Sequence, residues 1–197
     1  MATQKNASAP ELPEIPFADV HAWRDWLEMN HAESKGIWLK FFKKGSSVRS
    51  ITYEEALNEA LCYGWIDGQL RKGDAAYYLQ RFTPRTKKSI WSKRNREKVL
   101  ALEKAGRMKP SGMLQVELAK KDGRWEQAYD SPARMQVPQD FLEALSAHQQ
   151  AKAFYDSLNR TNQYAIAWRL QTARTPATRA KRFQTILEMM ARGEKFH

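Results

Sequence analysis

The sequence predicts an α+β protein that is predominantly helical, with a small sheet of about three strands in its N-terminal half and a helical C-terminal half. Two stretches in the first half, residues 37–43 and 76–82, are rich in the aromatic and aliphatic residues that strands favour. Apolar residues at helical spacing surround them, and from Pro110 onward the pattern is helical throughout. A small sheet with helices on one face is the simplest layered arrangement of such elements.

The N-terminal residues 1–16 are predicted to be a flexible arm, because they are rich in proline and low in complexity. A helix should follow from Asp19, a residue type that caps helix starts, to about His31, with its apolar residues on one face. Residues 37–43 form the clearest predicted strand, and a polar loop leads from it to the next helix.

The stretch from residue 52 to residue 95 is the most aromatic part of the chain and one of the most basic. Thr52 with Glu55 three residues later is a capping-box pattern, which indicates a helix start. Apolar residues at helical spacing follow, and Gly64 is a suitable residue to end the helix.

A hairpin is predicted directly after this helix. Residues 65–71 and 76–82 are its strands, and residues 72–74 have the composition of a turn. Pro84 should end the second strand, because proline lacks the backbone N–H that a sheet needs. Whether the strand at 37–43 joins this hairpin in parallel stays open.

The helix after the hairpin has an unusual charge distribution. Ser92 is a candidate cap for a helix over residues 93–105. From Arg81 to Lys98 there are eight basic residues and one acidic residue. Cations at the start of a helix oppose its dipole, so this arrangement is unfavourable unless it meets an anion.

The C-terminal half reads as a series of helices. Pro110 and Pro138 are candidate first residues, Thr161 is a candidate cap, and the pair Thr175–Pro176 begins the last helix. The pair Ser131–Pro132 is the best candidate for a linker. We therefore expect three parts: a flexible arm over 1–16, an α+β core over 17–130 and a helical region over 131–197. The core and the helical region could also form a single domain over 17–197.

The chain of 197 residues carries a formal net charge of +11, with a pI near 9.8. Such a charge favours polyanionic partners, namely nucleic acid, anionic lipid or an acidic protein. Simple solubility of a basic surface is an equally good explanation, because no nucleic-acid-binding motif accompanies the charge.

Four runs of residues resemble a known family: GIWLKFFKK, ITYEEALNEALCYGWIDGQ, YYLQRFTPRTKKSIWSKRN and GRMKPSG. With them the chain resembles the YdeI/OmpD-associated family, whose members are often described as bacteriocin-protection proteins, over nearly all of residues 17–197. The resemblance implies a role in protection against antimicrobial peptides and an association with an outer-membrane porin. It implies no defined chemistry and no catalytic residues.

A cytoplasmic location is expected from the residues themselves. The first sixteen residues hold one lysine, no apolar segment and three prolines, which is unlike a secretory signal. No apolar run approaches the roughly 18 residues that span a bilayer. Cys62 is the only cysteine and lies in the apolar part of a predicted helix, so we expect a buried, unreactive thiol.

Neither a metal nor a cofactor is expected. The four histidines do not have the spacing of metal ligands, and a single cysteine does not complete a site: His21, His31, His148 and His197. The glycine-rich patterns that hold phosphates are missing, as is the motif around a nucleophilic serine.

Asp67 is the one carboxylate that lies among aromatic residues, next to Trp65. If it were buried, it could act as a general base with a raised pKa. An Asp-Gly turn or a structural hydrogen bond is the simpler explanation. For this reason we expect a binding protein rather than an enzyme.

The remaining candidate is a ligand-binding surface of polar, basic and aromatic residues: Tyr63, Trp65, Asp67, Gln69, Arg81, Thr83, Arg85, Ser89, Trp91, Ser92 and Asn95. Arg81 and Thr83 should share a strand face, and guanidinium groups suit carboxylates or phosphates. The alternative is an internal network that holds the hairpin to the next helix.

A second basic stretch contains six cations and no acid: Arg160, Arg169, Arg174, Arg179, Lys181 and Arg182. These side chains could form the solvent-exposed face of amphipathic helices. If they converge, they could instead form an anion-binding site. An anionic small molecule or acidic partner is therefore the first hypothesis for the ligand, and nucleic acid is the second.

Overall fold

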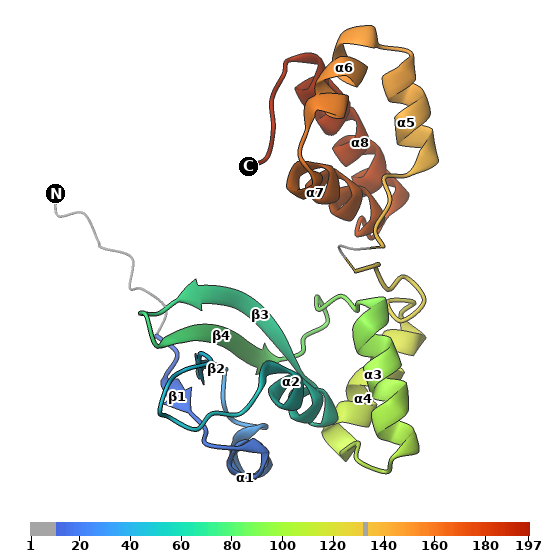
Figure 1. Ribbon diagram of the computed structural model, residues 1–197. Helices are drawn as coiled ribbons and strands as arrows, with labels where there is room; N and C mark the ends of the chain where they lie inside the picture. Colours follow the sequence, from blue (N-terminus) through green and yellow to red (C-terminus); the bar gives the residue numbers. More distant parts are fainter. Residues whose placement is uncertain (1–10, 132–133) are drawn as a thin grey trace, which may run out of the picture. The chain divides into compact units, whose positions relative to one another are not determined.

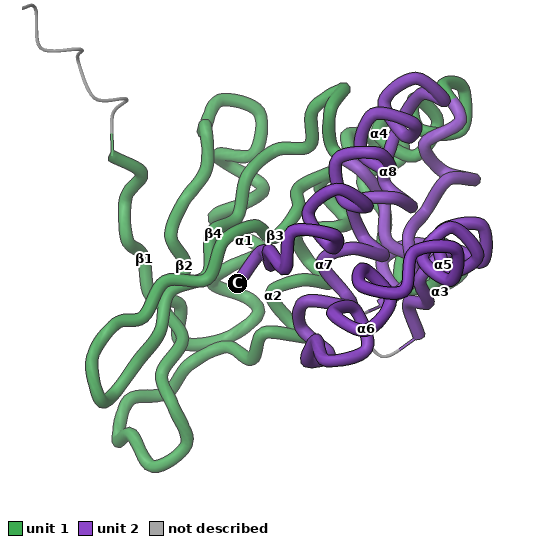
Figure 2. Tube along the Cα trace, turned by 90° about the horizontal axis from the view of Figure 1, so that it is seen from above, with its two compact units in different colours: residues 1–89, 97–122 green, residues 90–96, 123–197 purple. Residues whose placement is uncertain are grey.

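The computed structural model describes residues 11–131 and 134–197, which form four strands and eight helices (Figure 1). The predicted α+β class, with a small sheet in the first half and helices in the second, is confirmed. The described residues form two compact units (Figure 2). Unit 1 holds those up to residue 89 together with 97–122, and unit 2 holds 90–96 together with 123–197. The predicted division into 17–130 and 131–197 stays a prediction.

Unit 1 contains the sheet, with the strands β1 (Glu14–Pro16), β2 (Ile37–Phe42), β3 (Trp65–Lys72) and β4 (Tyr77–Pro84). The strand order is β1-β2-β4-β3. β1 is parallel to β2, whereas β2 and β3 are both antiparallel to β4. The first long strand therefore joins the hairpin in antiparallel fashion, which the sequence left open.

The sheet has one strand more than the predicted three. Residues 14–16 pair with β2, and the amide of Trp38 donates to the carbonyl of Pro13 at 2.9 Å. The end of the predicted flexible arm is thus an edge strand, a position where proline is tolerated because one side of the strand needs no partner. Residues 1–10 of that predicted arm lie outside the described residues.

The helices of unit 1 are α1 (Val20–Asn30), α2 (Tyr53–Cys62), α4 (Pro110–Lys121) and most of α3 (Lys93–Lys104). Figure 1 shows α1 and α2 on the same face of the sheet. Every second residue of β2 is buried, which matches the alternation of side chains along a strand. Between sheet and helices lies a core of fully buried side chains: Trp23, Leu27, Ile37, Leu39, Phe41, Leu57 and Phe82.

The predicted capping box of α2 is present, with both the Thr52 and the Glu55 side chains bonded to each other's backbone N–H. Gly64 follows the helix with a φ of +76°, a conformation that favours glycine. Helix α4 passes close to this end of α2: a Cβ atom on Gly112 would lie 2.1 Å from the carbonyl oxygen of Cys62. Glycine at 112 is therefore required by close packing.

Unit 2 is built from α5 (Gln139–Ser146), α6 (Gln149–Ser157), α7 (Arg160–Gln171) and α8 (Pro176–Ala191). Their apolar faces meet in a common core: Phe141, Leu145, Ala151, Tyr155, Leu158, Ile166, Leu170, Ile186 and Met190. Residues 90–96 belong to the same unit, where the Trp91 ring meets the Trp125 ring edge to face, with centroids 4.9 Å apart.

Two helix starts in unit 2 can be compared with the prediction. Thr175 caps α8 as predicted, through a hydrogen bond from the amide of Thr178. The prediction of a cap at Thr161 is wrong: Asn159 is the cap of α7 and accepts from the amide of Asn162 at 3.0 Å. Asparagine is at least as good a cap as threonine, and it comes two residues earlier.

Within residues 11–131 and 134–197, we find no helix whose length and hydropathy would let it cross a bilayer.

Candidate anion-binding site

The eleven residues predicted to bind a ligand are distributed over both units. Those from Tyr63 to Ser89 belong to unit 1, and Trp91, Ser92 and Asn95 belong to unit 2. The surface as a whole therefore stays a prediction, and its members are described unit by unit.

Tyr63 and Trp65 have structural roles. Both are almost fully buried. The hydroxyl of Tyr63 donates to the carboxylate of Glu28, and the indole N–H of Trp65 donates to the carbonyl of His31 at 3.1 Å. Burial, and then the hydrogen bond to Glu28, raise the pKa of Tyr63, so this phenol stays neutral.

Asp67 is half-buried on β3 and accepts a hydrogen bond of 2.8 Å from the hydroxyl of Tyr53. The expected Asp-Gly turn is absent from this part of unit 1, because β3 continues through Gly68, with a register irregularity between Asp67 and Leu70. The structural hydrogen bond is present instead. A role for Asp67 as a general base stays a hypothesis.

Arg81 and Thr83 lie on the same face of β4, opposite Trp38 on β2 and Ile66 on β3 respectively. The Nε atom of Arg81 is buried and makes no hydrogen bond within the described residues. Gln69 is exposed in the irregular part of β3.

Arg85 and Ser89 follow β4. Arg85 is buried, and its amide donates to the carbonyl of Gly64 at 2.9 Å. The Ser89 hydroxyl accepts from the amide of Thr86 at 2.9 Å, which closes a local turn.

In unit 2, Ser92 caps α3 as predicted, accepting from the amide of Asn95 at 3.1 Å. Trp91 and Asn95 are buried. Lys93, in the first turn of this helix, pairs with Asp130 at 2.8 Å. In unit 1, Lys98 pairs with Glu54 at 2.6 Å. The protein's own acids thus compensate two cations of this helix.

In the second basic stretch, by contrast, several cations gather in one pocket that has no acidic side chain in its described lining. Three of its cations, Arg169, Lys181 and Arg182, line one pocket of about 430 Å³ between α7 and α8. Trp168 and Ile186 form an apolar part of the pocket wall, and the ring of Phe196 from the C-terminal segment also lines the pocket. No acidic side chain is among the described residues that line this pocket.

The two guanidinium groups of the pocket are oriented by carbonyl oxygens. Arg169 donates to the carbonyl of Ala165 at 3.0 Å, and its guanidinium carbon lies 3.8 Å from the centroid of the Phe196 ring. Arg182 donates to the carbonyl of Arg169 at 2.8 Å. Each guanidinium has five N–H donors, so most of those donors remain for a ligand.

The charges of this pocket are not compensated by the protein. Arg169, Lys181 and Arg182 form no ion pair within the described part of the chain, whereas Arg179 on the same helix pairs with Asp140 at 2.8 Å. Burial, together with the charge of Arg182, lowers the pKa of Arg169. The guanidinium still carries its charge at neutral pH, so the pocket combines like charges that an anion would stabilise.

The position of Phe196 depends on a buried asparagine. Asn162 is 2% exposed. Its Oδ1 atom accepts from the amides of Phe196 and His197 at 3.2 and 3.0 Å, and its Nδ2 atom donates to the carbonyl of His197 at 3.3 Å. The segment that carries the ring is therefore fixed to α7.

Sequence reasoning named the basic residues of this pocket but missed Trp168, Phe196 and Asn162. Trp168 lies among the apolar residues of its helix, and Phe196 lies beyond the end of α8. Trp168 stands next to Arg169, and this adjacent pair is a weak local signal for the pocket.

Groups of three or more potential metal-binding side chains are absent from residues 11–131 and 134–197.

Comparisons with known proteins match the N-terminal and C-terminal parts of the chain to two different families. Residues 15–115, just over half of the chain, match the family described as "Domain of unknown function (DUF8412)". The chain belongs to this family. Residues 134–193 match the family described as "Bacteriocin-protection, YdeI or OmpD-Associated". The resemblance to the YdeI/OmpD-associated family is thus confirmed for the C-terminal part, whereas the four runs on which it was based lie within residues 36–112.

No curated protein and no solved structure matches this chain significantly.

Proposed function

We propose that this protein is a non-catalytic binding protein for an organic anion, which it takes in the pocket between α7 and α8. The observation that carries the proposal is that Arg169 and Arg182 lie in the same pocket, next to an apolar wall. Arg182 donates to the backbone of Arg169, and no acidic side chain lines the described part of the pocket. Two positive charges that lie this close together are unfavourable unless a negatively charged group binds to them.

The lining of the pocket favours a particular class of anion. Guanidinium groups bind carboxylates and phosphates through paired hydrogen bonds. Trp168, Ile186 and Phe196 supply apolar surface on which a flat or aliphatic group could lie. A carboxylate or phosphate attached to an aromatic or short aliphatic group satisfies both requirements, whereas a free inorganic ion satisfies one.

The biological role that we propose is resistance to antimicrobial peptides in the cytoplasm. The pocket lies within or next to residues 134–193, the part that matches the bacteriocin-protection family. The match supports the role and names no ligand.

The binding proposal can be tested with four probes of similar size: phenyl phosphate, benzoate, benzamide and benzylamine. The two anions should bind, should shift the side-chain N–H signals of Arg169 and Arg182 in NMR spectra, and should release heat in calorimetry. The neutral and cationic probes should not. Arg169→Gln and Arg182→Gln should each weaken phenyl phosphate binding by about tenfold or more.

Arg192→Gln is the matched control, because Arg192 belongs to the same unit but pairs with Glu194 at 2.9 Å. It should leave the affinity unchanged. Equal binding of benzamide and benzoate, or equal losses in all three variants, would overturn the proposal.

The proposed role needs a separate test in cells. A strain that lacks the gene should be more sensitive to cationic antimicrobial peptides, and the wild-type gene should restore its survival. The Arg169→Gln/Arg182→Gln variant should fail to do so. Unchanged sensitivity of the deletion strain would remove the role but not the binding site.

Nucleic acid is the second candidate, supported by the net charge of +11. Binding to a polyanion weakens steeply with salt because counterions are released. A labelled single-stranded or double-stranded oligonucleotide that shows no binding at about 50 mM salt would exclude this candidate.

A further inference from the structure

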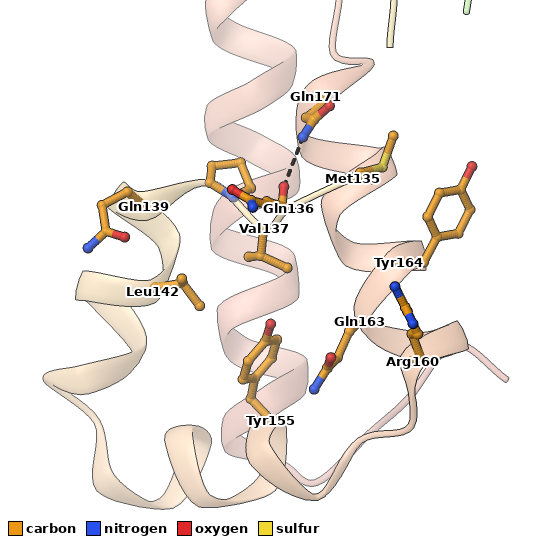
Figure 3. Close-up of a pocket in the computed structure, with 11 residues that line it drawn as sticks. Met135, Gln136, Val137, Gln139, Leu142, Tyr155, Arg160, Gln163, Tyr164 and Gln171 are labelled. Carbon is orange, nitrogen blue, oxygen red and sulfur yellow. Dashed lines mark hydrogen bonds between the residues drawn. The ribbon is translucent and has the colours of Figure 1, made fainter. Parts of the chain in front are cut away.

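Unit 2 contains a second cavity whose chemistry differs from that of the basic pocket. It has a volume of about 600 Å³ and is formed by α5, α6, α7 and the segment over residues 135–139 (Figure 3). Cavities of this size commonly hold small molecules. Arg160 is the only charged residue of the described lining, and no carboxylate faces the cavity.

The most informative residue of this cavity is Tyr155. It is 9% exposed, and its hydroxyl forms no hydrogen bond with any of the described residues. In Figure 3 this hydroxyl points toward Val137, into the space that the labelled side chains surround. The ring of Tyr155 is buried, whereas its hydroxyl is open to the cavity and available to a ligand. Since burial and the nearby charge of Asp156 raise the pKa of Tyr155, its hydroxyl stays a neutral donor.

Apart from Arg160, the other polar groups of the described lining are also neutral. Gln163 and Tyr164, from α7, make no side-chain hydrogen bond within the described residues. An amide and a phenol each donate and accept, so together with Tyr155 they match ligand groups that also do both. Hydroxyl groups have this property, whereas anions only accept and ammonium groups only donate.

The apolar part of the lining is suited to the face of a ring. Val137 and Leu142 lie on one side and the ring of Tyr155 on another (Figure 3). A purely apolar ligand would cover the Tyr155 hydroxyl and the Gln163 amide and leave them unpaired, which is costly. A ring with hydroxyl groups on its edge and C–H groups on its faces satisfies both parts of the cavity.

The wall formed by residues 135–139 is attached to the end of α7. The side-chain amide of Gln171 donates to the carbonyl of Gln136 at 2.8 Å, as the dashed line in Figure 3 shows. This bond keeps the segment in place over the cavity, so the site is formed before a ligand arrives.

We propose that this cavity is a binding site for a hydroxylated ring of monosaccharide size, recognised by Tyr155, Gln163 and Tyr164. This site is separate from the anion pocket, which lies between α7 and α8 and has other lining residues.

The test is an NMR titration of the full chain with glucose, N-acetylglucosamine and, as a ring without hydroxyl groups whose ammonium group only donates, cyclohexylamine. The two sugars should shift signals of Tyr155, Gln163 and Tyr164, and the third probe should not. Tyr155→Phe removes one oxygen atom and should weaken sugar binding by at least about fivefold. Gln163→Leu should do the same.

Gln184→Leu is the matched control, because Gln184 is exposed in the same unit and bonds to Glu188 at 2.9 Å. It should leave sugar binding unchanged. Tyr155→Phe should also leave the melting temperature unchanged or raise it, because the lost hydroxyl has no partner in the protein. A clear fall in melting temperature, or sugar binding that survives both cavity variants, would overturn the assignment.

The two sites can fail independently. Phenyl phosphate should shift Arg169 and Arg182 but not Tyr155, and the sugars should do the reverse. Loss of sugar binding in Arg169→Gln would contradict the separation of the two sites.

Discussion

The guanidinium of Arg169 lies over the ring of Phe196, with its carbon atom 3.8 Å from the ring centroid. A guanidinium is planar, so stacking on a ring sets the plane in which its remaining N–H groups point. The contact therefore orients the donors of the anion pocket and leaves their edge available to a ligand.

Replacing Phe196 with leucine should weaken phenyl phosphate binding by about two- to tenfold, because the cation–π contact and the ordered guanidinium are lost. Calorimetry on the two proteins measures this change. Phe183→Leu is the control: that ring packs on Phe141 at 5.1 Å and does not line the pocket. It should lower stability without a comparable loss of affinity, and a similar loss in both variants would contradict the role of Phe196.

Replacing Asn162 with alanine should release the C-terminal segment. The change removes hydrogen bonds to Phe196, His197 and Asn159, and should lower the free energy of unfolding by about 1–3 kcal/mol. Hydrogen exchange of the amides at 196 and 197 should become fast. Asn162→Asp keeps the acceptor oxygen for these amides and should retain their protection; unprotected amides in the wild-type protein would refute this account.

Stability should depend on pH through Glu59, which is 2% exposed and bonded to Arg24 and Arg107. Burial alone would raise the pKa of Glu59, but the two guanidinium groups outweigh it and hold the pKa below its ordinary value of 4.5. The unfolded chain therefore binds this proton more tightly. The stabilisation is fully present above about pH 4.5 and is lost as the pH falls through the folded-state pKa.

The measurement is urea unfolding of the wild-type protein and of Glu59→Gln between about pH 7 and pH 3. At neutral pH the variant should be less stable by about 2–4 kcal/mol, because two guanidinium groups lose their carboxylate. This difference should shrink as the solution becomes acidic. A difference that is constant with pH would show that Glu59 does not titrate as expected.

Gly112→Ala should destabilise unit 1 by about 1–3 kcal/mol, because the new methyl group would collide with the carbonyl oxygen of Cys62. Gly68→Ala is the matched control, since a Cβ atom there would meet nothing closer than 3.9 Å. It should change stability by less than about 0.5 kcal/mol. Thermal unfolding of the two variants separates close packing from the general effect of replacing glycine.

Cys62 should be unreactive in the folded protein. Burial raises the pKa of its thiol to about 11, and the side chain is 1% exposed. At about pH 8 the reaction with a disulfide reagent should be at least about a hundredfold slower than after denaturation in urea. Rapid reaction of the folded protein would show that the end of α2 opens readily.

Local features of this fold could be predicted because residues close in sequence create them. The capping boxes and caps at Asp19, Thr52 and Thr175 depend on hydrogen bonds over two or three residues. The hairpin of β3 and β4 depends on a turn and on strand-forming composition. The predicted cap at Thr161 is wrong because two residues that can cap a helix, Asn159 and Thr161, lie within one turn, and Asn159 is the cap of α7.

By itself, then, the sequence determined the helices, the hairpin, the charge and the family resemblance. Only the tertiary structure decided that residues 14–16 add a strand to β2, and that Arg169, Arg182 and Phe196 meet in one pocket. The physical reason is that such contacts join residues from separate elements, and their geometry depends on how all the apolar faces pack. Charge along a sequence shows which side chains could bind an anion, whereas packing decides which of them lie together without an acid of their own.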